Sequence, residues 1–174
     1  MNSPYMGKFK VTQKYKGTAH DGLDLVGLDS KEIHATVSGK VVFAGWQNSA
    51  NHSEGFGLYV VILAGGRYYL YAHLSEIKCK VGDQVKVTDV VGIEGYTGYT
   101  IPSGPNGAHC HYCVRTSMSP GTALDVSVIS GIPNVEGGVY DDGYRPAAPV
   151  PAKKTMKVTV EYDDHIFSGL LEEQ

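Results

Sequence analysis

The sequence is poor in cysteine and has no excess of basic charge. Its three cysteines, at positions 79, 110 and 113, are too few and odd in number for a disulfide framework, so we expect reduced thiols. Fifteen lysines and arginines against 18 aspartates and glutamates give a net charge of −3, which excludes a strongly basic nucleic-acid binder. No apolar run approaches the roughly 20 residues of a membrane-spanning helix. We therefore expect neither nucleic acid nor a membrane as a partner.

The amino terminus also has little that would direct export. Residues 1–7 show no basic stretch followed by an apolar stretch, so the sequence predicts a protein made in a cytoplasm without a signal peptide. The hydrophobic fraction of 42% still allows a buried core. A chain of 174 residues suffices for one domain with a short appendage.

Short strands and tight turns dominate what is present. The chain has 22 glycines and 12 tyrosines, a composition that favours strands and turns over helices. Strand-like runs lie at residues 40–44, 58–63, 67–72, 85–87, 90–93 and 109–115, and the second and third of these form a hairpin across a glycine turn. Only a turn at residues 74–77 and a segment at residues 123–129 are candidates for helix. The spacing predicts an all-β domain.

The composition changes near residue 145. Pro146, Pro149 and Pro151 predict an extended spacer, after which residues 156–162 alternate with period two and residues 165–171 return as a second strand. We expect a main domain at residues 1–144, a proline-rich linker at 145–153 and a C-terminal β-hairpin appendage at 154–174. An isolated hairpin is marginal in water, so the appendage docks on the main domain, pairs with another copy or belongs to a larger module.

The first candidate site is the segment His20-Asp21-Gly22-Leu23-Asp24. A separation of four residues places His20 and Asp24 on one face of either a helix or a strand, and Gly22 argues against a helix. Imidazole and carboxylate are a normal pair of ligands for a divalent metal. The alternative is a surface turn with a helper carboxylate.

The second candidate site is His109-Cys110-His111. Residues two apart on a strand face the same side, so the two imidazoles lie adjacent, and one can bind a metal while the other transfers protons. The alternative is a pair of solvent-facing histidines on an edge strand. The same alternation places Cys113 on the histidine face and Cys110 on the opposite face, which argues against a thiolate zinc knuckle or a redox pair.

A further histidine, His73, lies where the apolar strand at residues 67–72 gives way to a turn. Taken together, two histidines and one aspartate can make a three-ligand set that leaves the fourth tetrahedral position to water, as in a catalytic zinc site. Two further histidines then remain for proton transfer and for stabilising an oxyanion.

The order of these motifs resembles the M23 family of zinc metallopeptidases, the lysostaphin and LytM type, from about residue 20 to residue 115. His20-x-Gly22-x-Asp24 is similar to the first motif of the family, and Gly107-Ala108-His109-Cys110-His111 is similar to the last. Between them, the residues that resemble the family's hairpins, turn and strand are 37–45, 57–63, 71–75, 81–85 and 91–92.

This resemblance implies a LytM-type domain, mainly β, with an antiparallel, barrel-like sheet and long groove-lining loops. It also implies one Zn²⁺ per chain, with His20, Asp24 and His111 as ligands and His73 and His109 as the catalytic pair beside the metal. Enzymes of this family cut peptide cross-links in bacterial peptidoglycan. Which of the two catalytic histidines is the general base stays open.

Two residues depart from the family pattern. Cys110 stands where the family usually has an apolar residue, and Cys113 where it often has an acidic one. Neither position is a ligand, so we expect activity to be retained, although the orientation of His111 could differ. Alternatively, Cys113 could reach the metal.

Three histidines lie outside these motifs, and one loop leads into the last motif. His34, His52 and His165 match no motif position, and we expect them to be structural or solvent-facing. The loop at residues 96–108 is rich in Gly, Pro, Ser and Thr and leads directly to His109, so we expect Tyr96 and Tyr99 to line one wall of the groove.

The small size, the missing leader and the proline spacer resemble a bacteriophage endolysin, made in the host cytoplasm and acting on the cell wall after release. The appendage would bind the wall or bring copies together as a homo-oligomer. A virion-associated or bacterial autolytic enzyme is an alternative source.

Two alternatives come from other functional classes. A non-enzymatic, cell-wall-binding or regulatory LytM-like domain would have lost metal ligands, whereas all five site positions are filled here. A biotinyl or lipoyl carrier domain is similar at residues 81–85, but no hairpin turn carries a lysine flanked by methionine.

Overall fold

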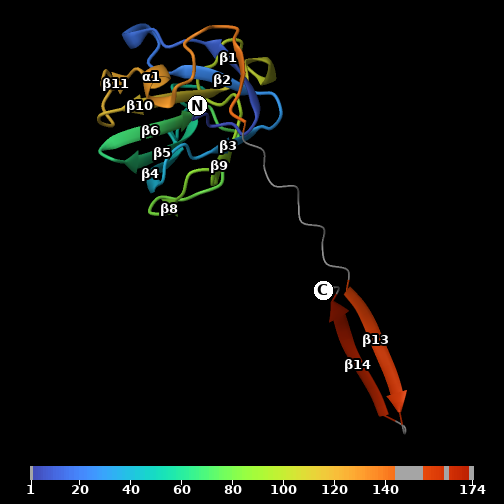
Figure 1. Ribbon diagram of the computed structural model, residues 1–174. Coiled ribbons are helices and arrows are strands. Elements are labelled where there is room, and N and C mark those ends of the chain that lie inside the picture. Colours follow the sequence, from blue (N-terminus) through green and yellow to red (C-terminus); the bar gives the residue numbers. More distant parts are fainter. Residues whose placement is uncertain (1, 144–154, 163–164, 173–174) are drawn as a thin grey trace.

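The structure is a computed structural model that describes residues 2–143, 155–162 and 165–172 (Figure 1). Its main sheet has nine strands in the order β12-β1-β2-β10-β6-β5-β4-β8, with β11 beside β10, and every pairing is antiparallel. These strands are β1 (Lys8–Gln13), β2 (Leu23–Gly27), β4 (Gly39–Trp46), β5 (Leu58–Ala64), β6 (Arg67–Ala72), β8 (Gln84–Val85), β10 (Cys110–Arg115), β11 (Ala123–Leu124) and β12 (Val139–Asp141).

The other elements are short. A second sheet has the order β3-β9-β7, formed by β3 (Glu32–His34), β9 (Val90–Ile93) and β7 (Glu76–Ile77). Within the described residues, helix is limited to the 3₁₀ turns η1 (Gly17–Ala19) and η2 (Pro105–Gly107) and the α-helix α1 (Val126–Ser130). The last two strands, β13 (Thr155–Tyr162) and β14 (His165–Glu172), form an antiparallel hairpin of their own. None of the helices in the described part of the chain has the length and apolar character needed to span a membrane.

The β5–β6 hairpin places one site residue next to the central strand. Gly65 and Gly66 both have positive φ, which residues with side chains rarely adopt, so the chain turns there. β6 pairs with β5 on one edge and with β10 on the other, and Ala72 lies opposite His111. His73 therefore follows β6 at a point close to His111.

Strand β10 is buried along its whole length. Cys110, Tyr112 and Val114 belong to the larger apolar cluster, whereas Cys113 belongs to a smaller cluster on the other face. The alternation predicted for Cys110 and Cys113 is therefore confirmed. A strand held on both faces is a rigid support for His111.

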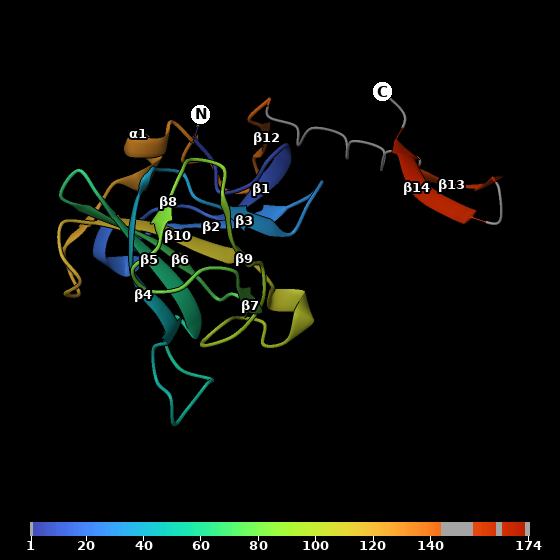
Figure 2. The same cartoon turned by 90° about the horizontal axis from the view of Figure 1, so that it is seen from below.

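Two long connections lie side by side at one end of the sheet. The β4–β5 connection at residues 47–57 and the β9–β10 connection at residues 94–109 both project in the lower part of Figure 2. The Gly98 amide donates to the His52 carbonyl at 2.9 Å, and the Tyr99 amide donates to the Gly55 carbonyl at 2.9 Å. A Cβ added at Gly57 would lie 2.3 Å from the carbonyl carbon of Thr97, so the two connections are in direct backbone contact.

The mainly β, antiparallel fold expected from the sequence is confirmed. The main sheet is open rather than a closed barrel, because its strand path ends at β12 on one side and at β8 on the other. The helical turn expected at residues 74–77 is wrong: Glu76–Ile77 form β7, which pairs with β9. The helix expected at residues 123–129 is present as α1, which spans Val126–Ser130. Asp125 caps its N-terminus by accepting a hydrogen bond from the Ser127 amide.

The predicted linker at residues 145–153 lies outside the described residues, and so do its predicted boundaries at residues 144 and 154. The division into residues 1–144, 145–153 and 154–174 stays a prediction. Within the last segment, the described residues form the expected hairpin.

Candidate functional site

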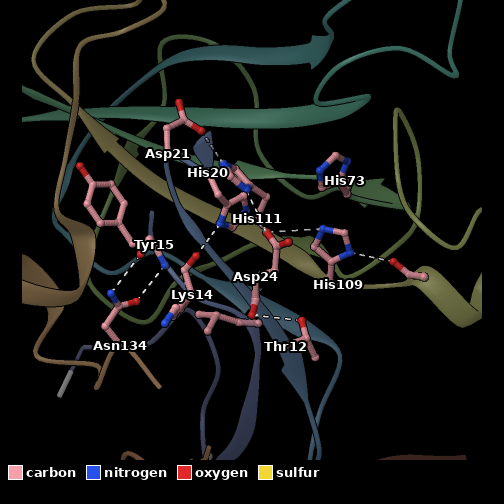
Figure 3. A network of polar contacts seen from close by, with 12 residues as sticks. Thr12, Lys14, Tyr15, His20, Asp21, Asp24, His73, His109, His111 and Asn134 are labelled. Carbon is pink, nitrogen blue, oxygen red and sulfur yellow. Dashed lines mark hydrogen bonds and ion pairs between the residues drawn. The ribbon is translucent and has the colours of Figure 1, made fainter. Parts of the chain in front are cut away.

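Strand pairing brings the candidate site residues together. β2 and β10 are antiparallel neighbours, and their register places Asp24 directly opposite His111. His20 ends η1 just before β2 begins. His109 precedes β10, and His73 follows β6, the neighbour of β10 on its other side. The five side chains meet beside these adjacent strands (Figure 3).

The three predicted metal ligands converge on one place. Asp24 Oδ1 lies 3.1 Å from His20 Nε2 and 2.9 Å from His111 Nδ1. One donor atom from each of the three residues lies within 4.8 Å of the others. His20 Nδ1 is 2.9 Å from the carbonyl oxygen of Lys14, so a neutral His20 donates its proton there and keeps the Nε2 lone pair for a metal (Figure 3).

The chemistry of this donor set fits zinc. Asp24 is buried, and burial by itself would raise the pKa of its carboxyl, but hydrogen bonds with His111 and His20 hold that pKa well below its usual range. Asp24 is therefore an ionised carboxylate at neutral pH. Two imidazoles and one carboxylate form a three-ligand set of the catalytic zinc type, which leaves one tetrahedral position to solvent or substrate.

His111 lies between two carboxylates, of which Asp21 was not expected from the sequence. The Nε2 atom of His111 is 3.2 Å from Asp21 Oδ1, close enough for an ion pair. The two atoms are not aligned for a hydrogen bond. Burial would lower the pKa of His111, but Asp21 and Asp24 raise it well above its usual value. Asp21 is affected by the same contacts: chiefly His111, and to a smaller extent Arg115, hold the pKa of its carboxyl below the usual range.

Two further residues complete the surroundings of His111. Arg115 Nη2 donates to Asp21 Oδ2 at 2.5 Å. Phe56, from the β4–β5 connection, stacks on the His111 ring with the centroids 5.5 Å apart. The Arg115 guanidinium lies 5.1 Å from the centre of the Phe56 ring, a favourable cation–π contact. The predicted ligand spacing does not include Asp21, Phe56 or Arg115. Asp21 and Phe56 reach His111 from other segments, and Arg115, on the same strand as His111, contacts these two residues.

His73 and His109 form a pair beside the three ligands. Their ring centroids are 4.7 Å apart, and His109 Nε2 lies 3.6 Å from Asp24 Oδ1. His73 Nδ1 is 2.8 Å from the carbonyl oxygen of Thr97, and His109 Nδ1 is 2.7 Å from that of Gly107. Burial, followed by the proximity of His109, lowers the pKa of His73 to about 4, so His73 is neutral at pH 7.

The site opens into a groove of about 420 Å³. It is lined by Gln13, Ala19, His20, Asp24, Gly55, Phe56, His73, Tyr99, Thr100, Ile101, His109 and His111. The β9–β10 connection supplies Tyr99 and Ile101, which are 67% and 78% exposed and so form a wall that a bound molecule can cover. Tyr99 lines the groove as expected, whereas Tyr96 is not among the lining residues.

Of the histidines outside the motifs, His34 and His52 do not line this groove. His34 is buried, and its Nδ1 is 2.8 Å from the carbonyl oxygen of Thr88, which agrees with a structural role. His52 stacks on Trp46 with the ring centroids 3.6 Å apart. The side chain of His165 lies outside the described residues.

The two cysteines that depart from the family pattern are both buried. Cys110 packs in the apolar core. The sulfur of Cys113 lies within 4.8 Å of ligand atoms of Asp21 and His111, but it is not part of the group formed with His20 and Asp24. The structure therefore brings Cys113 close to His111 without adding it to the predicted ligand set.

Comparison with curated proteins finds two staphylococcal peptidases. Glycyl-glycine endopeptidase ALE-1 of Staphylococcus capitis and lysostaphin of Staphylococcus simulans are each 34% identical to the chain over 110 residues. The match covers 63% of this chain, 28% of ALE-1 and 21% of lysostaphin. The chain thus spans less than a third of the length of these relatives.

Comparison with solved structures finds the same fold. The catalytic domain of the antimicrobial peptidase lysostaphin from Staphylococcus simulans has a TM-score of 0.55 and 29% identity, over 70% of this chain and 89% of that one. The catalytic domain of the prophage-encoded M23 protein EnpA from Enterococcus faecalis has a TM-score of 0.54 and 29% identity, over 71% and 94%. Residues 18–125 match peptidase family M23, a segment that makes up more than half of the chain and contains all five predicted site residues. This chain belongs to peptidase family M23.

Proposed function

We propose that the chain is a zinc-dependent endopeptidase that hydrolyses peptide cross-links of bacterial peptidoglycan and so lyses the cell wall. One observation carries the proposal: three metal-ligating side chains and two further imidazoles converge on one groove. The names of the curated relatives, a glycyl-glycine endopeptidase and lysostaphin, support a peptide of the cell wall as substrate.

In this proposal His20, Asp24 and His111 would hold the zinc ion, since His20 Nε2 and His111 Nδ1 both lie beside the Asp24 carboxylate. Bound there, zinc supplies a Lewis acid that polarises the scissile carbonyl and makes water more acidic. The hydrogen bond from His20 Nδ1 to Lys14 and the ionised state of Asp24 prepare these ligands for the ion.

His73 and His109 move protons. A neutral His73 donates Nδ1–H to the Thr97 carbonyl, and a neutral His109 donates Nδ1–H to the Gly107 carbonyl, so each keeps its lone pair on Nε2. Either Nε2 can accept the proton of the attacking water. The imidazolium that forms can then stabilise the oxyanion or protonate the leaving amine.

The proposal is tested with purified cell walls of several cross-link types. We expect the chain to release new amino termini, a chelator to abolish the release and added zinc to restore it. His111→Ala removes a ligand and abolishes cleavage, whereas His109→Ala removes a proton carrier and abolishes cleavage with zinc still bound. His52→Ala, which removes an exposed ring stacked on half-buried Trp46, is the control and keeps full activity. Undiminished cleavage in excess chelator contradicts the mechanism.

We also propose that the chain is a phage endolysin, made in the host cytoplasm and acting on the wall after release. The likeness to a prophage-encoded M23 domain supports this source. Cytoplasmic expression in a host with a susceptible wall is expected to leave cells intact until the membrane is permeabilised. Lysis of cells with an intact membrane contradicts this part of the proposal.

A further inference from the structure

We propose that Asp21, held in place by Arg115, is a positioning residue that orients the His111 ring for zinc binding. This inference rests on the metal site of the proposed function, but it is independent of which substrate the enzyme cleaves. It concerns a residue that lies outside the predicted ligands and the predicted catalytic pair.

The first support is the position of Asp21 relative to the His111 ring. When His111 binds a metal through Nδ1, its remaining ring proton lies on Nε2. Nε2 is buried and makes no aligned hydrogen bond with any of the described residues, and the carboxylate oxygen of Asp21 is 3.2 Å away. Metal-bound histidines are usually oriented by an acceptor for this second N–H, and a carboxylate is one of the common acceptors. Without Asp21, a donor would be buried with no acceptor, which is unfavourable.

The second support is the way Asp21 is itself fixed. Arg115 Nη2 donates to Asp21 Oδ2, so the two carboxylate oxygens face different partners: Oδ1 faces His111 and Oδ2 faces Arg115. The side chain of Arg115 is only 7% exposed, and its guanidinium lies over Phe56, which stacks on His111. These contacts form a closed cycle that runs from His111 through Asp21, Arg115 and Phe56 back to His111.

The third support is the placement of both partners on one strand. His111 and Arg115 are four residues apart on β10, so their side chains lie on the same face. β10 therefore supplies a predicted zinc ligand together with the residue that holds its orienting carboxylate. Because both residues are on β10, their positions relative to each other are fixed by one strand, and Asp21 contacts both of them.

A second metal ion is the competing use of this cluster, because Asp21, His111 and Cys113 also place one donor atom each within 4.8 Å. An ion bound there would lie next to the Arg115 guanidinium, whose contact with Asp21 is 2.5 Å. The repulsion between two cations at this distance disfavours that use.

The test measures the zinc affinity of the full chain by competition with a chromophoric chelator. Asp21→Asn keeps the shape of the side chain but offers one acceptor oxygen, which cannot serve both His111 and Arg115. We expect a loss of zinc affinity of roughly 10–100-fold. Asp21→Glu recovers part of the loss. Asp89→Asn, which removes an exposed carboxylate that accepts from the Lys86 amide, is the matched control and binds zinc as tightly as the unmodified chain.

A spectroscopic measurement separates orientation from a merely structural role. In the zinc-loaded chain we expect the His111 Nε2–H resonance to be protected from exchange with water, and in Asp21→Asn we expect it to exchange rapidly. If Asp21→Asn does not fold, Arg115→Lys replaces it: lysine keeps the charge but loses the planar fork, and we expect weaker zinc binding with the same loss of protection.

Several outcomes overturn the inference. They are unchanged zinc affinity in Asp21→Asn or, where that variant is unfolded, in Arg115→Lys; a lowered melting temperature of the chelated protein without a change in zinc affinity; and a second zinc ion that is lost on Asp21→Asn. If the variants behave as expected but the chain does not cleave cell walls, the proposed function fails and this inference stands.

Discussion

At the scale of single residues, Gly22 shows why the first motif needs a glycine at its centre. A Cβ at this position would lie 2.6 Å from His111 Cε1 and 2.7 Å from the carbonyl oxygen of Tyr112. Neither the buried imidazole nor the backbone of a central strand can move away easily. The glycine is therefore required by the close approach of the segment just before β2 to the His111 ring.

We predict that Gly22→Ala displaces His111 and weakens zinc affinity by about tenfold or more, with a matching loss of cell-wall cleavage. The measurements are the chelator competition and the release of new amino termini. Gly45→Ala is the control, since the atoms nearest to its added Cβ are 3.8 Å away, an ordinary contact distance. Retention of full zinc affinity by Gly22→Ala would show that the ring accommodates the methyl group.

His73 carries a prediction about pH in the metal-free protein. Its pKa is lowered from 6.5 to about 4, chiefly by burial and then by the proximity of His109. The unfolded chain therefore binds a proton at a pH where the folded chain does not, and stability rises with pH across this range. The contribution of neutral His73 is fully present above pH 6.5 and is lost as the pH falls to about 4.

Nuclear magnetic resonance of the ring protons tests this directly. We expect the His73 signals of the chelated protein to stay at their neutral positions between pH 8 and about 5. An ordinary titration midpoint near 6.5 would contradict the burial of this side chain.

At the scale of elements, Thr97 is one of the residues that anchor the β9–β10 connection. Its hydroxyl donates to the Leu74 carbonyl at 2.8 Å and accepts from the Leu58 amide at 2.9 Å. Its carbonyl oxygen accepts from His73 Nδ1. One residue thus connects the groove wall, the β5 strand and His73, one of the predicted catalytic pair.

We predict that Thr97→Val lowers the free energy of unfolding by roughly 1–3 kcal/mol, because two partners lose their hydrogen bonds. The rate of cross-link cleavage falls as well, while zinc affinity stays unchanged, since no metal ligand contacts the hydroxyl. Urea unfolding and the cleavage assay measure the two effects. Thr116→Val, which removes an exposed hydroxyl with only a 3.4 Å contact, is the control. Equal effects of the two variants would contradict the anchoring role.

At the scale of the whole molecule, the predicted zinc site connects two parts of the chain. His20 directly follows η1, Asp24 belongs to β2, and His111 belongs to β10, 87 residues from Asp24. The three ligands are adjacent only when β2 and β10 are paired. Zinc is therefore expected to bind the native chain in preference to the unfolded chain.

We predict that a chelator lowers the melting temperature and that added zinc restores it. At a free zinc concentration of 100 times the dissociation constant, the stabilisation is about 2.7 kcal/mol. Thermal unfolding followed by tyrosine and tryptophan fluorescence measures the shift. In His111→Ala the melting temperature is expected to be independent of zinc, and a persisting shift in that variant would place the ion elsewhere.

The sequence predicts those strands whose residue types and flanking turns are recognisable within a short segment of the chain. The β5–β6 hairpin could be read from a β-branched and aromatic run and the glycine turn at Gly65 and Gly66. β1 has a readable signal too, although it is not among the strands expected above, since Phe9 and Val11 are buried between exposed residues. β3 and β7 have three and two residues, too few for a periodic pattern, and they form because β9 offers both its edges for pairing.

The same division holds in the site. The spacing of His20 with Asp24, and of His109 with His111, is local, and it indicated which side chains could share a face and a metal ion. The contact between Asp21 and Arg115 joins residues 94 positions apart, and Phe56 reaches His111 from a different connection. Short-range alternation and turn residues are properties of adjacent amino acids, so the sequence alone determined the longer strands, such as the β5–β6 hairpin, and the candidate ligands. Strand register and contacts between connections arise only when distant segments pack together, so tertiary structure alone decided what surrounds the His111 ring.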